Sequence, residues 1–257
     1  MNDLVSIIMP NYNASKYIDA SIQSVLNQTY KNFELIIVDD VSTDNSVELI
    51  KKYKDKRIKL FINEKNSGAA ISRNKALREA KGKWIAFLDS DDTWEQNKLE
   101  DQLHFMERNN YDFTFTDYKI CQDGIWENVI RTGPNKVNYR KLLNYCYFST
   151  ITVIYNREKV GLIQISDLKK NNDYAIWLHA LKKVVAYRYP ICLSNYIKHN
   201  ESISSGKKSK LIKHHYILFR QELKKSKFVS LILTVNNLFH GVLKKLFYKK
   251  RILNKLS

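Results

Sequence analysis

The chain has 257 residues, 44% of them hydrophobic and 12% aromatic, which is enough to bury a core and excludes disorder as the default state. Its cysteines, Cys121, Cys146 and Cys192, lie far apart, so we exclude a disulfide framework and a cysteine-based zinc site and expect a reducing compartment. The net charge of +17 belongs mainly to residues 207–257, which carry 14 Lys and Arg against one acid, Glu222. A basic tail on a nearly neutral body does not favour a nucleic-acid-binding protein.

The first 117 residues alternate strand and helix patterns joined by short connections. We predict strands at 5–9, 34–38, 58–62 and 84–88, and helices around 18–26, from 47, over 69–80 and over 95–108. Two of these strands are near-continuous apolar runs, which is typical of strands covered on both faces. Repeated strand–helix units require a mainly parallel sheet with helices on both faces, so the fold class is α/β and Rossmann-like.

The pattern changes after residue 112. We predict a strand at 112–117, a turn at 122–124 into a returning strand, a helix at 141–145, a strand at 151–155 and a helix at 173–182. The main domain is therefore placed at residues 1–205, with halves at 1–117 and 118–205. A helical extension is placed at residues 206–257.

Acidic side chains follow the second and fourth predicted strands at the points where these strands end. Asp39-Asp40 follows one strand, and Asp89-Ser90-Asp91-Asp92 follows the other. The carboxyl ends of parallel strands meet at one edge of a sheet, and acids gathered there repel each other unless a cation lies among them. The chain has neither GxGxxG nor GxxxxGK(S/T), so a bound diphosphate would need Mg²⁺ or Mn²⁺ instead of a glycine-rich loop. The alternative is that these acids cap the helices that follow.

Four segments carry a resemblance to a known family: Ser6–Asn13, Val38–Asp44, Asn66–Asn74 and Leu88–Asp92. In their order and spacing they resemble family 2 glycosyltransferases of the GT-A fold, over roughly residues 4–205. The resemblance implies that residues 1–117 form the nucleotide-sugar half and that residues 118–205 form the acceptor half.

The resemblance also implies a nucleotide-sugar-binding set, made of Pro10, Tyr12, Asp40, Arg73, Asp89 and Ser90. Tyr12 would stack on the base, and Asp40 would hydrogen-bond the edge of the base. Arg73 would reach the base or the phosphates, with a salt bridge on its helix as the alternative. Asp89 would contact the ribose or the metal, and Asp91 would ligate the Mn²⁺ or Mg²⁺ that bridges the diphosphate.

Two further residues receive roles in the acceptor half. The segment from Asn172 to Leu178 resembles the family's acidic pair followed by Tyr-x-x-Trp-Leu, with Asn172 where an acid is common. Asp173 would be the general base that accepts the proton of the acceptor hydroxyl, and a helix N-cap is the alternative. His199 would complete the metal site, the alternative being a solvated loop side chain. One base and one metal imply a single displacement, so the product is inverted.

The basic extension contains an apolar helical stripe with a period of three and four residues, made of Phe228, Ile232, Val235, Phe239, Val242 and Leu246. Asn236, Asn237 and His240 interrupt the run, so we expect this helix to lie on an anionic membrane surface and not to span it. The alternative is a pair of helices packed on the main domain or on a second subunit of a homo-oligomer.

The sequence therefore predicts a metal-dependent, inverting enzyme that moves a hexose or N-acetylhexosamine from a UDP-sugar to a saccharide or lipid-linked acceptor. We expect it to be cytoplasmic, peripheral on the inner face of the cell membrane, and to act in bacterial surface-polysaccharide synthesis. One alternative is a nucleotidyltransferase, which is disfavoured by the absence of a basic, glycine-rich loop after the first strand. The other is a non-catalytic, membrane-associated scaffold, which is disfavoured by the intact acids Asp89, Asp91 and Asp173.

Overall fold

The structure is a computed structural model that describes residues 2–199 and 208–251. The described strands are β1 (Val5–Asn11), β2 (Phe33–Asp39), β3 (Ile58–Ile62), β4 (Trp84–Phe87), β5 (Thr93–Trp94), β6 (Phe113–Gln122), β7 (Ile125–Arg131), β8 (Lys136–Val137), β9 (Val153–Asn156), β10 (Ala186–Lys198) and β11 (Lys249–Arg251). The described helices are α1 (Ile18–Leu26), α2 (Ser46–Lys52), α3 (Gly68–Glu79), α4 (Lys98–Asn109), α5 (Tyr139–Asn144), α6 (Arg157–Val160), α7 (Asn172–Ala180), α8 (Lys208–Ile217) and α9 (Lys227–Phe247). A 3₁₀ turn, η1 (Thr150–Thr152), precedes β9, and a π-helical turn, η3 (Leu218–Glu222), follows α8.

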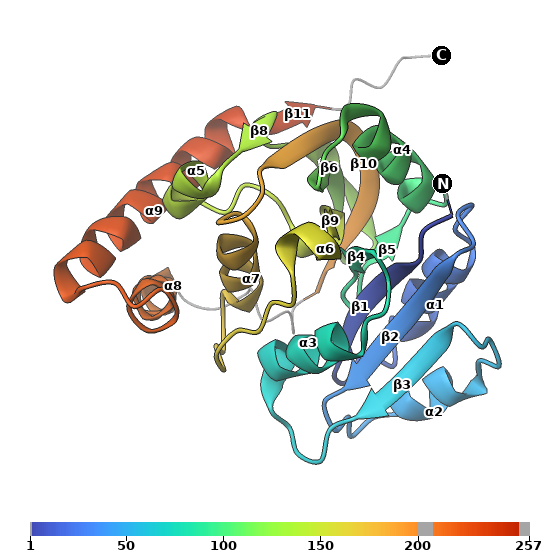
Figure 1. Ribbon diagram of the computed structural model, residues 1–257. Coiled ribbons are helices and arrows are strands. Elements are labelled where there is room, and N and C mark those ends of the chain that lie inside the picture. The colour runs from blue at the N-terminus through green and yellow to red at the C-terminus, as the bar shows by residue number, and fades with distance from the viewer. Residues whose placement is uncertain (1, 200–207, 252–257) are drawn as a thin grey trace.

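One continuous sheet runs through the molecule in the order β11-β7-β6-β9-β4-β1-β2-β3, and β10 lies beside β6, β5 and β8 (Figure 1). The strands β4, β1, β2 and β3 are parallel to their neighbours in this group, as the alternating pattern predicts. β9, β7 and β11 are antiparallel to the strands beside them. The predicted α/β class with a mainly parallel central sheet is therefore confirmed.

Two hydrophobic cores lie on the two faces of the sheet, because alternate residues of a strand point to opposite faces. On β1, Ile8 faces the core that contains α3 and α7, whereas Ile7 faces the core that contains α1 and α4. All the side chains of β2 are buried, which accounts for its continuous apolar run. The sheet is therefore covered on both faces, and its edges remain for binding.

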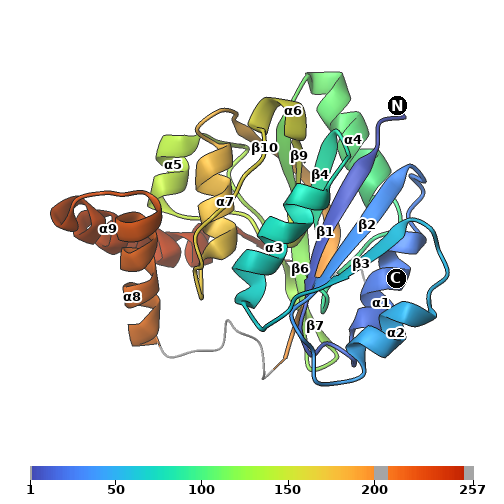
Figure 2. The same ribbon diagram turned by 60° about the horizontal axis from the view of Figure 1, so that its bottom comes forward.

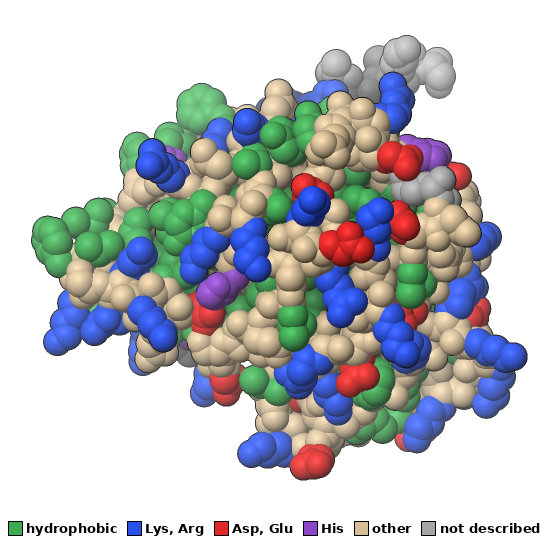
Figure 3. All heavy atoms as spheres, viewed as in Figure 1, with side chains coloured by type: hydrophobic (Ala, Val, Ile, Leu, Met, Phe, Trp, Pro, Cys, Tyr) green, Lys and Arg blue, Asp and Glu red, His purple; other side chains and the backbone are tan. Residues whose placement is uncertain are grey.

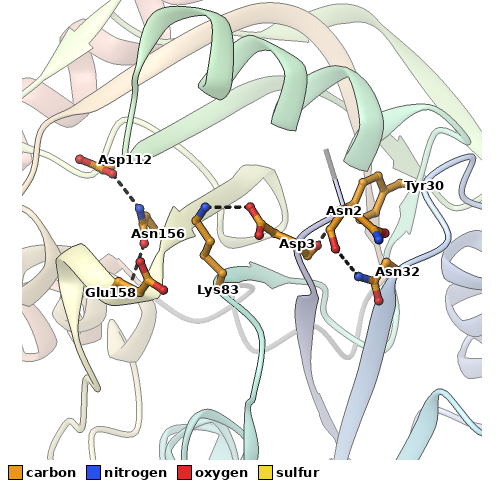
Figure 4. Close-up of polar contacts among 8 residues, drawn as sticks. All are labelled: Asn2, Asp3, Tyr30, Asn32, Lys83, Asp112, Asn156 and Glu158. Carbon is orange, nitrogen blue, oxygen red and sulfur yellow. Dashed lines mark hydrogen bonds and ion pairs between the residues drawn. The ribbon is translucent and has the colours of Figure 1, made fainter.

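The edge at the amino ends of these strands carries several polar contacts within the chain (Figure 4). Lys83 Nζ lies 2.7 Å from Asp3 Oδ2, and the hydroxyl of Tyr30 donates to the carbonyl of Asp3. Asn156 Nδ2 donates to Asp112 at 2.9 Å. These contacts join the chain before β1 and β6 to the starts of β4 and α6.

The C-terminal extension packs against the side of the molecule that carries α5 and α7, far from β3 and α2 (Figures 1 and 2). Leu218 and Phe219 of η3 are fully buried in the same core as Trp177 of α7. After α9 the last described residues form β11, which pairs with β7, whereas the sequence predicted helix throughout the extension. The division into a domain at 1–205 and an extension at 206–257 stays a prediction.

Helix α9 places polar side chains inward and apolar side chains outward. Thr234 and Asn237 are only 1% exposed, whereas the six residues of the predicted apolar stripe are 50–72% exposed. Figure 3 shows hydrophobic side chains gathered on the part of the surface where α9 lies, with Lys and Arg beside them. Across residues 2–199 and 208–251, we find no helix with the length and hydropathy needed to cross a membrane.

Candidate active site

The carboxyl ends of β1 and β2 are joined by buried hydrogen bonds. Asn11 Nδ2 donates to Asp39 Oδ2 at 2.6 Å, and Asp39 also accepts from the amide and the hydroxyl of Ser42. Asp39 is fully buried, and its carboxylate is used in fixing this loop. The chain between these contacts passes through Val41 with φ of 63°, a left-handed conformation that is costly for a β-branched residue. The hydrogen bonds of Asp39 thus hold a strained turn next to the predicted nucleotide site.

Asp40 binds the amino end of helix α3. One carboxylate oxygen accepts from Asn63 Nδ2 and from the amide of Ser67, and the other accepts from the amide of Gly68 at 2.6 Å. An anion at a helix amino terminus satisfies free backbone amides and is favoured by the helix dipole. The structure therefore gives Asp40 a capping role at α3, not at the next helix α2 to which the sequence alternative pointed, and its predicted contact with the base stays a prediction.

Pro10 and Tyr12 lie at the rim where β1 ends. Pro10 pairs with Val38 in the sheet, and Tyr12 follows the last residue of the strand. Tyr12 is 50% exposed, so part of this residue is open to a ligand such as a base. The stacking role predicted for Tyr12 is compatible with this exposure and stays a prediction.

Arg73 connects the two halves of the site. It lies on α3 and is buried, yet its guanidinium donates to Asp89 Oδ1 at 2.5 Å and to the side-chain oxygen of Asn172 on α7. Burial opposes the charge, but the carboxylates of Asp89, Asp173 and Asp91 outweigh it, so the pKa of Arg73 is raised. Asn172, which replaces the family's usual acid, is therefore a hydrogen-bond acceptor for Arg73.

Asp91 faces His199 across the carboxyl edge of the sheet. His199 Nε2 lies 2.9 Å from Asp91 Oδ2, and the His199 ring stacks on Tyr17 with ring centroids 4.8 Å apart. Burial, and then the neighbouring Asp89 carboxylate, raise the pKa of Asp91, while His199 acts in the opposite direction. Two residues that are 108 positions apart in the sequence thus meet as predicted, although their role as metal ligands stays a prediction.

Asp92 and Ser90 hold the acidic loop in place. Asp92 is fully buried, and its Oδ1 accepts from the amide of Ile197 at 2.7 Å, which fixes the end of β10 two residues before His199. Ser90 is also buried, and its carbonyl accepts from the hydroxyl of Ser21 on α1. Asp92 is thus a positioning residue that the sequence did not reveal, because only the pairing of β5 with β10 brings Ile197 to it.

The donor atoms at this edge suit a divalent cation. Asp91 supplies a carboxylate, His199 supplies an imidazole, and the Asp89 carboxylate lies close enough to perturb Asp91. Mn²⁺ and Mg²⁺ accept carboxylate oxygens, and Mn²⁺ tolerates an imidazole more readily than Mg²⁺ does. Among residues 2–199 and 208–251, no group of three or more His, Cys, Asp or Glu converges as a complete metal cage.

Asp173 lies in the first turn of α7, beside the Arg73 and Asn172 contact. The N-cap of this helix is Asn171, so the structure does not support the alternative that Asp173 is the cap. Thr150 Oγ1 donates to Asp173 Oδ2 at 3.0 Å, which leaves Oδ1 without a hydrogen bond in the described part of the chain. The carboxylate is thus held at one oxygen and available at the other, as a general base requires.

The comparisons with known proteins agree with this geometry. The family model for glycosyl transferase family 2 matches residues 6–165. The chain belongs to this family. It is 42% identical over 222 residues to the putative teichuronic acid biosynthesis glycosyltransferase TuaG of Bacillus subtilis, which covers 85% of this chain and 88% of the relative. It is also 42% identical over 217 residues to WfaP of Escherichia coli, a UDP-Glc:alpha-D-GlcNAc-diphosphoundecaprenol beta-1,3-glucosyltransferase, covering 84% of this chain and 86% of the relative.

Solved structures of the same fold support the GT-A assignment. Residues 1–349 of S. aureus TarS in complex with UDP-GlcNAc superpose with a TM-score of 0.71 at 22% identity, covering 91% of this chain and 71% of that one. The mannosyltransferase PcManGT of Pyrobaculum calidifontis, in complex with GDP-Man and Mn²⁺, superposes with a TM-score of 0.59 at 16% identity, covering 93% and 75%. The predicted GT-A fold is confirmed.

Proposed function

We propose that this glycosyltransferase moves a hexose or N-acetylhexosamine from a UDP-sugar to a saccharide or lipid-linked acceptor, with inversion, in cell-surface polysaccharide synthesis. The observation that carries the proposal is the network of Arg73, which joins Asp89 at the nucleotide side to α7 at the acceptor side. The carboxylates of Asp89, Asp173 and Asp91 all lie near enough to Arg73 to raise its pKa, which supports one shared site. The names of TuaG and WfaP support the polysaccharide pathway and the UDP-sugar donor.

The chemistry follows from the position of Asp173. Its free Oδ1 accepts the proton of the acceptor hydroxyl while the hydroxyl oxygen attacks the anomeric carbon. The new carbon–oxygen bond forms as the bond to the diphosphate oxygen breaks on the opposite face, so the configuration inverts. Thr150 holds the other carboxylate oxygen, which keeps Oδ1 directed toward the acceptor.

The leaving diphosphate carries negative charge that this chain must balance. Arg73 is the buried cation nearest to the acids of the site, and Asp91 and His199 are the residues that would hold Mn²⁺ or Mg²⁺. A bound divalent cation would stabilise the charge that develops on the diphosphate.

A donor panel tests this proposal. The purified full-length chain is incubated with UDP-, GDP- and dTDP-sugars, and donor hydrolysis is measured with Mn²⁺, with Mg²⁺ and with EDTA. We expect hydrolysis of one or more UDP-sugars that EDTA abolishes. Hydrolysis of GDP- or dTDP-sugars alone would overturn the donor assignment, and no hydrolysis with any sugar would overturn the function.

The outward face of α9 supports a peripheral position on the inner face of the cell membrane. This apolar face, defined by the six exposed stripe residues, lies between Lys227 at one end and Lys245, Lys249 and Lys250 at the other. An apolar face bordered by cations is complementary to a surface of anionic lipid, and each Lys or Arg near such a surface contributes about 1 kcal/mol. The proposed occupant of this face is therefore the membrane.

Sedimentation with vesicles tests the membrane proposal. The full chain should pellet with phosphatidylglycerol vesicles and much less with phosphatidylcholine vesicles or at high salt. The double variant Val235→Ser with Phe239→Ser should lose most of this binding. The matched control is Leu162→Ser, an exposed leucine outside the extension. If the chain ignores anionic vesicles but dimerises through α9, the occupant is a second subunit, and the membrane proposal is wrong.

A further inference from the structure

Helix α7 begins at a residue that its own helix does not fix. Asn171, the N-cap, lies in the left-handed region with φ of 59°, a conformation that asparagine tolerates better than most residues with a Cβ. An N-cap asparagine usually accepts a hydrogen bond from an amide of the first turn, but within residues 2–199 and 208–251 the Asn171 side chain makes no such bond. The direction of the first turn, which carries Asp173, is therefore fixed by contacts from outside α7.

His215 of α8 supplies one of these contacts. His215 is buried, with 7% of the residue exposed, and Asn171 Nδ2 lies 3.3 Å from His215 Nδ1. Burial, and then the neighbouring His214, lower the pKa of His215 to about 4, so the ring is neutral at neutral pH and Nδ1 accepts the hydrogen bond from Asn171. The side chain that would otherwise cap α7 is thus held by the C-terminal extension.

His215 also contacts the first turn of α7 at Tyr174. The two rings pack edge to face, with their centroids 6.3 Å apart. Tyr174 is buried, and its hydroxyl accepts a hydrogen bond from Asn237 Nδ2 on α9 at 3.0 Å. Because Asn171 and Tyr174 flank Asp173 in the sequence, the extension holds the backbone on both sides of this residue.

The contact of Glu222 with α7 is of a different kind. The Glu222 carboxylate lies 2.7 Å from Nε2 of His179, which belongs to the last turn of the helix. This contact attaches the extension to α7 without touching the first turn. Glu222 therefore allows the attachment of the extension to be tested separately from the positioning of Asp173.

We propose that His215 is a positioning residue for Asp173 and that it acts through Asn171. This inference rests on the proposed function, in which Asp173 is the general base. Thr150 binds Asp173 Oδ2, so the direction of Oδ1 depends on where the first turn of α7 carries the residue. A displacement of about 1 Å at a reacting group costs roughly 10²-fold in rate. The extension therefore contributes to catalysis as well as to the fold.

The kinetics of donor hydrolysis test this proposal, with water as the acceptor whose proton Asp173 takes. The substrate is the UDP-sugar that the full-length chain hydrolyses in the donor panel. His215→Phe keeps an aromatic ring beside Tyr174 but removes the hydrogen-bond acceptor, so kcat should fall about 10- to 100-fold while KM stays unchanged. His215→Asn, whose side-chain oxygen can take the place of Nδ1, should keep kcat within about threefold of the wild type. Equal losses in both variants, or a raised KM with an unchanged kcat, would overturn the proposal.

Combined variants show through which residue His215 acts. Asn171→Gly adopts the left-handed conformation freely but lacks the side chain, so adding it to His215→Phe should cause no further loss of kcat. In the Asp173→Asn background, His215→Phe should leave the remaining rate unchanged, because no base is left to position. Losses of kcat that multiply in either combination would show that His215 acts on the fold in general, and the positioning role would be wrong.

Amide hydrogen exchange, measured without a donor, separates this proposal from the proposed function. The amide of Ala175 donates to the carbonyl of Asn171 at 3.0 Å, so its exchange rate reports whether Asn171 stays in place. Exchange at Ala175 should become faster in His215→Phe. In the matched control Glu222→Gln, exchange at Ala175 and kcat should both stay within about twofold of the wild type.

The exchange experiment has two contrary outcomes. Unchanged exchange at Ala175 in His215→Phe, or equally faster exchange in Glu222→Gln, would overturn the positioning role whatever the activity. Faster exchange in His215→Phe alone, in a chain that hydrolyses no donor sugar, would support the hold on α7 and overturn the proposed function.

Discussion

Helices α1 and α9 have the same kind of apolar periodicity but bury opposite faces. In α1, Ile18, Ile22 and Val25 are fully buried against the sheet. In α9, Val235 and Phe239 belong to the apolar stripe and are both 60% exposed. A hydrophobic period therefore identifies a helix, but the surface that the rest of the chain offers decides which face is buried.

The polar face of α9 is buried because its partners are polar. Asn236 donates to the side-chain oxygen of Asn144 at 2.7 Å, and Asn237 binds the hydroxyl of Tyr174. These amides, which interrupt the apolar stripe in the sequence, are the residues that dock the helix. The apolar face of α1 thus builds a core of the sheet, whereas the polar face of α9 docks the extension on the main domain.

The first prediction concerns a substitution at the predicted metal site that leaves the extension unchanged. Asp91→Asn should leave the fold intact and reduce transfer about 10³-fold or more, because a lost metal ligand removes several kcal/mol of transition-state stabilisation. The loss should be equal for soluble and lipid-linked acceptors, and vesicle binding should not change. Initial rates with both acceptors give the measurement.

The control for that variant is Asp112→Asn at the opposite edge of the sheet, where the carboxylate accepts a hydrogen bond from Asn156 (Figure 4). Its activity should stay close to that of the wild type. Near-normal turnover of Asp91→Asn, together with activity that survives EDTA, would contradict the metal assignment.

The second prediction separates binding from chemistry at Asp173. Asp173→Asn keeps the shape and the hydrogen bond from Thr150 but removes the proton acceptor. The transfer rate should fall by roughly 10²–10⁴-fold, the usual contribution of a general base, while the affinity for the UDP-sugar stays unchanged. Calorimetry and single-turnover rates measure the two effects separately. A collapse of donor affinity would show that Asp173 acts at the donor site.

The strands that carry the candidate site were largely predictable from the sequence. The strands β1 to β4 were predicted close to their observed bounds, because their apolar runs and short loops are local signals. The acids at the ends of β2 and β4 were predicted to meet, because parallel topology brings carboxyl ends together. In the structure Asp39 and Asp40 bind their own loop and the amino end of α3, so this meeting stays a prediction. The meeting of Asp91 with His199 rested on the family resemblance, since no local pattern links residues 108 positions apart.

The features that could not be predicted depend on contacts between segments that are distant in the sequence. The 13-residue strand β10 was not predicted, because Pro190 and two register irregularities disrupt its alternation. Three contacts each need a partner from a distant segment: Asp40 with the amide of Gly68, Asp92 with the amide of Ile197, and Lys244 with the carbonyl of Cys146. Which face of α9 is buried follows from Asn144 and Tyr174, which the pattern of α9 itself does not contain.

The third prediction tests the opposite burial of the two stripes directly. Ile22→Ala in α1 should lower the free energy of unfolding by about 2–5 kcal/mol, because it opens a cavity in a closed core. Val235→Ala in α9 should change it by less than about 0.5 kcal/mol, because that side chain is already exposed to solvent. Urea unfolding of both variants gives the comparison. Similar decreases in the free energy of unfolding for both variants would mean that the apolar face of α9 is covered in solution, as in a homo-oligomer.

The last prediction concerns Glu222, the only acid in the sequence of the extension, where the extension contacts α7 and Ser166 of the main domain. Its carboxylate lies 2.7 Å from His179 Nε2 on α7 and accepts from the amide and the hydroxyl of Ser166. Burial opposes the charge, but these partners outweigh it, so the pKa of Glu222 is lowered from 4.5 to about 2. Since the folded pKa lies below the unfolded one, the stabilisation is complete above about pH 4.5 and is lost as the pH falls toward about 2.

Glu222→Gln should therefore lower the free energy of unfolding by roughly 1–2 kcal/mol at pH 7, the usual cost of losing a charge-assisted hydrogen bond. The difference in the free energy of unfolding between wild type and variant should decrease as the pH drops from about 4.5 to about 2, because the wild-type carboxylate then becomes protonated and neutral. Urea unfolding at several pH values measures this difference, and Glu127→Gln on β7 is the matched control, since its partner Arg131 lies outside this contact. A difference in the free energy of unfolding that stays constant across this range would show that Glu222 does not stabilise the fold through its charge.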